Sequence, residues 1–184
     1  MLAKLGAIYI LSERYRDAIT TLESFLPTAQ SINDRQSKAQ ALGNLGIAYG
    51  ALGNYSKAIE LYQQAGKLMW AIHDRRGLGT VLLNLGKTFA TLGDYRNAEA
   101  SYQQSVNIAQ QTEDPEGESI ALGNLGVMYA DLGDSNKAIV QHNRSLLIAR
   151  AIEERSLQAS ALINLGTVHH ALTDRNKALN YGVA

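Results

Sequence analysis

The sequence of 184 residues contains no cysteine, only two prolines and a single tryptophan. Without cysteine, disulfide bonds and thiolate chemistry are excluded, although the redox compartment stays undetermined. No charge of one sign is in excess, because seventeen basic residues balance seventeen acidic ones. The resulting weak electrostatic field of the protein does not favour nucleic acid or an anionic membrane as a partner. We therefore predict that the protein binds neither.

Long apolar runs are also missing. No stretch reaches the roughly 18 apolar residues that a membrane span needs, and the first residues do not form a charged start followed by a cleavable apolar segment. The sequence shows no Ser/His/Asp, paired-carboxylate or Cys/His arrangement, and no glycine cluster follows a predicted strand, as a phosphate loop would require. We predict a soluble, cytoplasmic protein that is not an enzyme and needs no cofactor.

One five-residue stretch returns at a spacing of forty residues. It reads Leu-Gly-Asn-Leu-Gly at 42–46 and 122–126, Leu-Leu-Asn-Leu-Gly at 82–86 and Leu-Ile-Asn-Leu-Gly at 162–166. A weaker copy keeps Leu2, Leu5 and Gly6. A strict internal period indicates a stack of copies in place of one globular core. We predict a single array over 1–184, with repeats at about 1–34, 35–74, 75–114, 115–154 and a partial repeat at 155–184.

Each repeat is predicted to contain two helices, because apolar residues recur in it at helical spacing. The break inside a repeat is marked by Gly53-Asn54, Gly93-Asp94, Gly133-Asp134 and Thr173-Asp174. The break between repeats is marked by Asn33-Asp34, His73-Asp74, Asp114-Pro115 and Glu153-Glu154. Glycine can close one helix in a left-handed conformation, and Asn or Asp can cap the next. The predicted helices are 1–12, 15–31, 35–52, 55–72, 76–92, 95–112, 116–132, 135–152, 155–172 and 175 to the end.

Small residues hold two fixed positions of the repeat. One is filled by Gly6, Gly46, Gly86, Gly126 and Gly166, and the other by Ala18, Ala58, Ala98, Ala138 and Ala178. We predict that they let paired helices approach closely. The motif's first glycine is present at 43 and 123 but is replaced by Leu83 and Ile163. We expect this alternation to leave the wall of a groove open at each glycine and to fill it at each large residue.

These residues resemble the tetratricopeptide repeat, whose pattern is Trp-x2-Leu-Gly-x2-Tyr, then Ala-x3-Phe, then Pro. One copy reads Leu42, Leu45, Gly46, Tyr49, Ala58 and Tyr62. Leucine replaces the tryptophan, the closing proline is missing and the period is forty in place of thirty-four. The longer unit is similar to the repeats of spindle-orientation and G-protein-modulator adaptors and of kinesin light chains. The resemblance implies an all-α solenoid of helix-turn-helix repeats, wound into a right-handed superhelix whose first helices line a concave groove for extended peptides.

The motif's asparagines lie on a helical wheel almost opposite the leucines. An asparagine amide can pair with both the N–H and the C=O of a peptide backbone. We predict a peptide-binding face made of Asn44, Asn84, Asn124 and Asn164, with Gln40 and Thr80 beside them and Lys87 and Asp131 adding charge selectivity. The alternative is that the asparagines bond only neighbouring repeats and set the pitch of the stack. A clamp for a terminal carboxylate is not expected, because its positions hold Gln40, Thr80, Ile120 and Ser160.

Two histidines occupy aromatic positions of the repeat, His142 where Tyr62 stands and His169 where Tyr49 stands. We expect them to pack together or to share a hydrogen bond and to bind no metal, because a zinc site needs a third ligand and supporting groups.

Trp70 stands at a position that is polar in the other repeats. We expect it to be either a packing residue or a contact for another domain.

The predicted function is a non-catalytic scaffold for a protein or peptide ligand. The alternative is a structural spacer or a segment that associates end to end.

Overall fold

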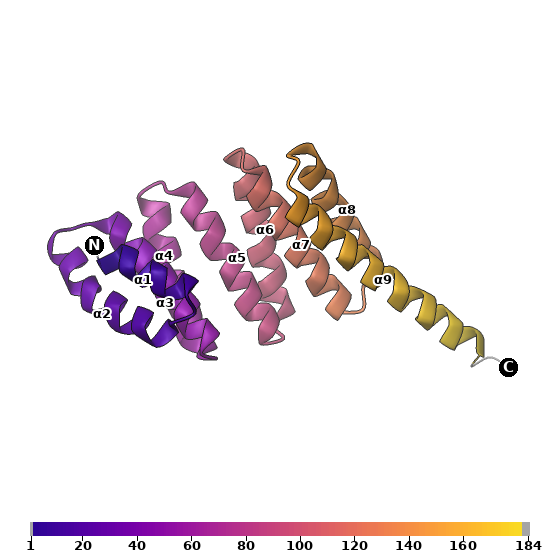
Figure 1. The fold of residues 1–184 in the computed structure, drawn as a ribbon, viewed down its shortest axis with the longest axis horizontal. Coiled ribbons are helices and arrows are strands. Elements are labelled where there is room, and N and C mark those ends of the chain that lie inside the picture. The colour runs from indigo at the N-terminus through magenta and orange to yellow at the C-terminus, as the bar shows by residue number, and fades with distance from the viewer. Residues whose placement is uncertain (1, 182–184) are drawn as a thin grey trace. The chain divides into compact units, whose positions relative to one another are not determined.

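The computed structural model describes residues 2–181, side chains of residues 3 and 174–181 excepted, and in this part of the chain nine α-helices and no strand are found (Figure 1). The helices are α1 (Leu2–Leu11), α2 (Tyr15–Ser31), α3 (Arg35–Ala51), α4 (Tyr55–Ala71), α5 (Arg75–Thr91), α6 (Tyr95–Gln111), α7 (Pro115–Asp131), α8 (Ser135–Ala151) and α9 (Arg155–Tyr181). The first eight begin and end within one residue of the predicted bounds. The all-α prediction is confirmed, and the fold is a solenoid of helix-turn-helix repeats.

Hydrogen bonds at the helix ends explain why the turns are so short. After α3, the N–H of Gly53 donates to the carbonyl of Gly50 and the N–H of Asn54 to that of Tyr49, at 3.0 and 2.9 Å, while Gly53 has a φ of +80°. This pair of bonds is the Schellman motif. The side chain of Asn54 then accepts from the N–H of Lys57 in the first turn of α4, which begins at Tyr55. One residue thus ends the closing motif of one helix and caps the next.

The same kind of cap recurs at five of the other turns, with aspartate in place of asparagine. Asp34, Asp74, Asp94, Asp114 and Asp134 each accept a hydrogen bond from the backbone N–H three residues on. These bonds hold the pKa of Asp34 and Asp134 below the ordinary aspartate value. The residues predicted to mark the breaks therefore make them, except at one position.

The break predicted at Thr173-Asp174 is wrong, because α9 continues without interruption to Tyr181. Where the three preceding repeats have glycine, this repeat has threonine. A β-branched residue strongly resists a positive φ, and the hydroxyl of Thr173 donates to the carbonyl of His169, one turn back in the same helix, at 3.0 Å. The sequence thus lacks the residue that would let the chain reverse here.

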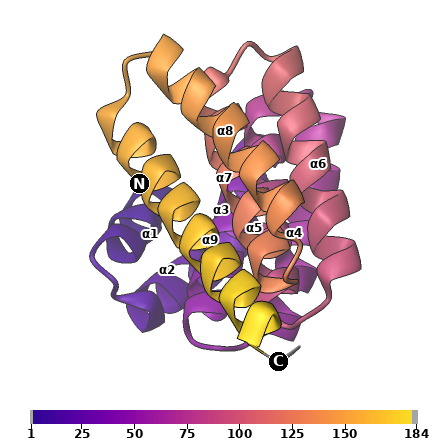
Figure 2. The ribbon, with the colours of Figure 1, turned by 90° about the vertical axis from the view of Figure 1, so that its right-hand side faces the viewer.

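Two compact units divide the chain, an N-terminal unit of Met1–Ser101 and a C-terminal unit of Tyr102–Ala184. In the N-terminal unit, α1 packs on α2 and α3, and α3 packs on α2, α4 and α5. In the C-terminal unit, α8 packs on both α7 and α9, and α7 also contacts α9 (Figure 2). Within each unit these helices therefore pack mainly on their neighbours along the chain, as expected for repeats.

The predicted close approach of paired helices is confirmed at most of the small-residue positions. Ala18, Ala58, Ala98 and Ala138 are completely buried. A Cβ added to Gly46 would lie 2.5 Å from the ring of Tyr62, and one added to Gly126 would lie 2.6 Å from the ring of His142. Gly166 differs from Gly46 and Gly126, because no described atom lies within 4 Å of a Cβ added to it. Its expected partner Ala178 lies outside the described side chains.

In the part of the chain that the structure describes, no helix is both long enough and apolar enough to cross a membrane.

Candidate functional site

The four repeated asparagines are all half-buried on the first helix of their repeats, α3, α5, α7 and α9. The adjacent leucines Leu45, Leu85 and Leu125 are at most 7% exposed. This contrast follows from helical geometry, because neighbouring residues lie about 100° apart around the axis. The motif therefore combines core leucines with amide side chains that reach the surface.

A cavity of about 340 Å³ lies in the N-terminal unit between α1, α3 and α5. Its lining residues are Lys4, Ala7, Gln40, Gly43, Asn44, Ile47, Met69, Asp74, Gly77, Thr80, Val81 and Asn84. Two of the predicted asparagines, together with the predicted Gln40 and Thr80, thus meet at one cavity. Its deep wall is apolar, because Val81 and Met69 are 3% and 5% exposed.

A second cavity, of about 220 Å³, lies in the C-terminal unit between α7, α8 and α9. Its lining residues are Ser119, Ile120, Gly123, Asn124, Val127, Ser145, Leu157, Ser160, Ala161 and Asn164. The other two predicted asparagines meet here. The neighbouring positions 120 and 160, which match Gln40 and Thr80 in the repeat, line this cavity as well.

The two cavities use the same positions of the repeat, displaced by eighty residues. The shared pairs are 40 and 120, 43 and 123, 44 and 124, 47 and 127, 77 and 157, 80 and 160, 81 and 161, and 84 and 164. Both are therefore built by two successive first helices that present a glycine, two asparagines and an aliphatic residue one turn further on. A hollow that the repeat itself produces twice is a property of the motif.

The predicted charge-selective residues are placed differently. Lys87 and Asp131 are exposed and line neither of these two cavities. The charge of Asp131 acts on Tyr102, where burial and, second, this carboxylate raise the pKa of the phenol to about 12. The charged groups that do line the N-terminal cavity are Lys4 and Asp74, which the helical wheel of a single repeat could not identify.

The asparagine side chains differ in their hydrogen bonding. The amide nitrogen of Asn124 donates to the carbonyl of Ile120 in its own helix at 2.8 Å. Among the described residues, the side chains of Asn44, Asn84 and Asn164 form no hydrogen bond with protein atoms. Three half-buried amides are therefore available to a ligand, and the oxygen of the fourth is available as an acceptor.

A pair of buried serines forms the back of the C-terminal cavity. The hydroxyl of Ser119 donates to the carbonyl of Ser145 at 3.1 Å, the hydroxyl of Ser145 donates to the carbonyl of Ser119 at 2.8 Å, and the two oxygens lie 2.9 Å apart. The corresponding positions of the N-terminal unit are Ala39 and Ala65. The matched change from two alanines to two serines is a signal in the sequence that the helical wheel of one repeat does not reveal.

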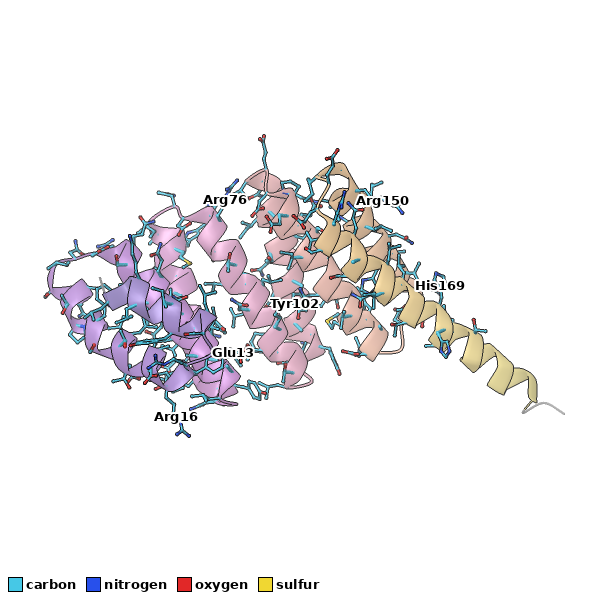
Figure 3. All side chains as sticks on the ribbon, in the orientation of Figure 1. Glu13, Arg16, Arg76, Tyr102, Arg150 and His169 are labelled. Atoms are coloured by element: carbon cyan, nitrogen blue, oxygen red, sulfur yellow. The ribbon has the colours of Figure 1, made fainter. Side chains whose placement is uncertain are left out.

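The histidines do not form the pair that the sequence suggested. His142 is 1% exposed and its Nδ1 has no hydrogen-bond partner, whereas His169 is exposed on α9 (Figure 3). The prediction of an aromatic core position is confirmed for His142 and is wrong for His169, because in the described part of the chain α9 packs on α7 and α8 and leaves His169 exposed. In the described part of the chain, no three His, Cys, Asp or Glu side chains are grouped to hold a metal.

Trp70 is 59% exposed, and the guanidinium carbon of Arg75 lies 3.9 Å from the centre of its ring. This cation–π contact joins the end of α4 to the start of α5. The indole is therefore a surface group held by its neighbour, not a core residue.

Solved structures with the same fold come from several kinds of protein. BtubC (BKLC) from P. vanneervenii has 25% identity and a TM-score of 0.81, over 97% of this chain and 74% of that chain. A Rap protein complexed with Competence and Sporulation Factor has 16% identity and a TM-score of 0.81, over 95% and 52%. A putative kinesin light chain from Podosopora anserina, with nearly identical TPR-like repeats, has 19% identity and a TM-score of 0.76, over 97% and 89%. This chain thus spans about half of the Rap protein.

The comparison with curated protein sequences gives no match. Family models are more informative. Two models described as tetratricopeptide repeat match the sequence, one over residues 1–69 and 117–182 and the other over residues 81–116. Together with the helix pairs and their small-residue contacts, these matches show that the chain belongs to the tetratricopeptide repeat family.

Proposed function

We propose that the chain is a non-catalytic scaffold that holds an extended peptide, or an extended segment of a partner protein, along the helix faces carrying Asn44, Asn84, Asn124 and Asn164. The tetratricopeptide repeat fold suggests protein-protein interaction in general. The observation that carries the finer proposal is the double occurrence of one cavity, each copy flanked by two repeated asparagines.

Main-chain recognition follows from the chemistry of the amide. Asparagine offers two donors and an acceptor, which match the C=O and N–H of an extended strand whatever its side chains are. Helices packed roughly 10 Å apart present one amide about every three residues of such a strand. We further propose that the repeats act as one continuous array of the long-period type found in the G-protein-modulator adaptors and kinesin light chains, so that a ligand can cross several of them.

The test begins with linear peptides selected from a random display library on the whole chain. The variant Asn44→Ala/Asn84→Ala should bind the selected peptides about five- to a hundred-fold more weakly, because each lost hydrogen bond contributes about 0.5–1.5 kcal/mol. Asn143→Ala is the matched control, since this asparagine is exposed on α8 and lines neither cavity. Failure to select any peptide, or unchanged affinity of the folded double variant, would contradict the proposal.

A second function, end-to-end self-association, is favoured by one observation. On α9, Leu162 and Ile163 are 50% and 67% exposed, whereas Leu42 and Leu122, which match Leu162 in the repeat, are at most 3% exposed. Light scattering across a range of concentrations tests this function. A mass that rises with concentration and returns to the monomer value in Leu162→Ser/Ile163→Ser supports it, and a constant monomer mass rules it out.

A further inference from the structure

Gly43 in α3 is a glycine that the packing of the protein does not require. A Cβ added to Gly43 would lie 3.7 Å from Cγ2 of Val81, an ordinary contact distance, whereas one added to Gly46 in the same helix would overlap the ring of Tyr62. Glycine in a helix costs about 1 kcal/mol relative to alanine. The fold therefore explains Gly46 but leaves Gly43 without a structural reason.

The repeat itself shows that a large side chain is acceptable at this position. Leu83 and Ile163 occupy it in the third and fifth repeats, and Leu83 is half-buried in α5. Gly123 is the other glycine, and an added Cβ there would lie 3.7 Å from Oγ of Ser145, again an ordinary contact distance. Both described cavities of the asparagine faces lie where this position is glycine. The missing side chain thus coincides with the hollow.

The hollow beside Gly43 suits an apolar group. Ile47, Val81 and Met69 supply aliphatic and thioether surface, and the volume of about 340 Å³ is at the lower end of the range for ligand sites. The size fits one or two side chains better than a cofactor. The only charged lining residues are Lys4 and Asp74, one of each sign, so the cavity does not select for a free carboxylate.

We propose that the space left by Gly43 takes one apolar side chain, of leucine to phenylalanine size, from an internal segment of the peptide whose main chain is held by Asn44 and Asn84. This inference rests on the proposed function, which it makes more specific. The asparagines bind the backbone of any extended peptide, and the space at Gly43 sets the position of the bound peptide at which a large apolar residue is required. The smaller cavity of about 220 Å³ at Gly123, backed by the Ser119 and Ser145 hydroxyls, selects a smaller side chain.

The first experiment probes the pocket without a peptide. N-acetyl-leucinamide and N-acetyl-phenylalaninamide are titrated into the whole chain, and the methyl signals of Ile47, Val81 and Met69 are followed by NMR. Both probes should shift these signals at lower concentrations than N-acetyl-alaninamide does. Gly43→Ala, which adds only a Cβ at contact distance, should keep this response, and Gly43→Leu, which fills the space, should lose it. Equal responses in Gly43→Leu, or to the alanine probe, would overturn the proposal.

The second experiment separates this inference from the proposed function. Peptides selected on the wild-type chain should contain an apolar residue whose change to alanine weakens binding about ten- to a hundred-fold, the range expected for burying one such side chain. In Gly43→Leu the same change should have little effect. If no peptide is selected, both proposals fail. If peptides bind through the asparagines but depend neither on an apolar residue nor on Gly43, the proposed function stands and the pocket assignment fails.

Discussion

The imidazole ring of His142 packs directly against Gly126. A Cβ added to this glycine would lie only 2.6 Å from Cε1 and 2.7 Å from Nδ1 of the ring. The ring belongs to α8 and the glycine to α7, so this contact fixes how closely the two helices of the repeat approach. In the N-terminal unit, the ring of Tyr62 stands in the same way against Gly46. Ring and glycine therefore form one packing unit of the repeat.

We predict that Gly126→Ala destabilises the protein by about 1–3 kcal/mol, because the new methyl group and the buried ring cannot both keep their positions. Gly123→Ala is the matched control in the same helix. Its Cβ would be at ordinary contact distance from Ser145, so the higher helix propensity of alanine should leave stability unchanged or raise it by up to about 1 kcal/mol. Urea unfolding followed by circular dichroism measures both, and equal losses would show that the ring is not the cause.

His142 should make the protein less stable as pH falls below about 6.5. Burial lowers the pKa of this imidazole below its ordinary value of 6.5. Below pH 6.5 the unfolded chain therefore binds more protons than the native state, and the free energy of unfolding decreases as pH falls until the folded pKa is reached. Above pH 6.5 His142 adds no pH dependence. The slope from one group cannot exceed about 1.4 kcal/mol per pH unit.

Urea midpoints measured from pH 8 to pH 5 test this dependence. His142→Tyr, which installs the residue found at position 62, should flatten the profile. His169→Tyr is the control, because this histidine is exposed, and it should leave the slope unchanged. A slope that persists in His142→Tyr would assign the effect to another group. The caps Asp34 and Asp134, whose pKa values are lowered by their backbone partners, contribute losses only near pH 4 and below.

The Ser119 and Ser145 hydroxyls should behave as a coupled pair. Each single change to alanine should cost about 0.5–1.5 kcal/mol, since it removes a hydrogen bond to the opposite carbonyl. The contact between the two hydroxyl oxygens is lost in either variant. The double variant should therefore lose less than the sum of the singles, because the same contact cannot be lost twice. A double-mutant cycle in urea measures this difference, and strict additivity would contradict the coupling.

Much of the fold could be predicted from the spacing of a few residue types. Glycine followed by Asn or Asp correctly marked the three turns at Gly53, Gly93 and Gly133, because a left-handed residue and a cap are what a Schellman closure needs. The corresponding pair Thr173-Asp174 has no glycine, and the break predicted there was wrong because α9 continues through it. The division at Ser101 and Tyr102 could not be predicted, since a period treats every repeat as equivalent.

The candidate site was predicted in part. The helical wheel placed the asparagines on the face opposite the leucines, and comparison of the repeats showed the alternation of glycine with larger residues at positions 43, 83, 123 and 163. The wheel could not identify Lys4, Met69 and Asp74 as neighbours of Asn44 and Asn84, because Lys4 and Met69 lie on the other helices α1 and α4 and Asp74 lies in a turn. The assignment of Lys87 and Asp131 stays a prediction, since the wheel gives direction around a helix but not distance from a cavity.

The central claim, that the repeated asparagines hold a peptide backbone, is tested most directly by their own side-chain signals. The NH₂ resonances of Asn44, Asn84, Asn124 and Asn164 can be followed by ¹⁵N NMR while a selected peptide is added to the whole chain, with Asn143 as an internal control. We predict that Asn44 and Asn84 shift and become protected from solvent exchange as the peptide saturates, that Asn124 and Asn164 follow for longer peptides, and that Asn143 does not change. Saturable binding that leaves all four repeated asparagines unshifted would contradict the account.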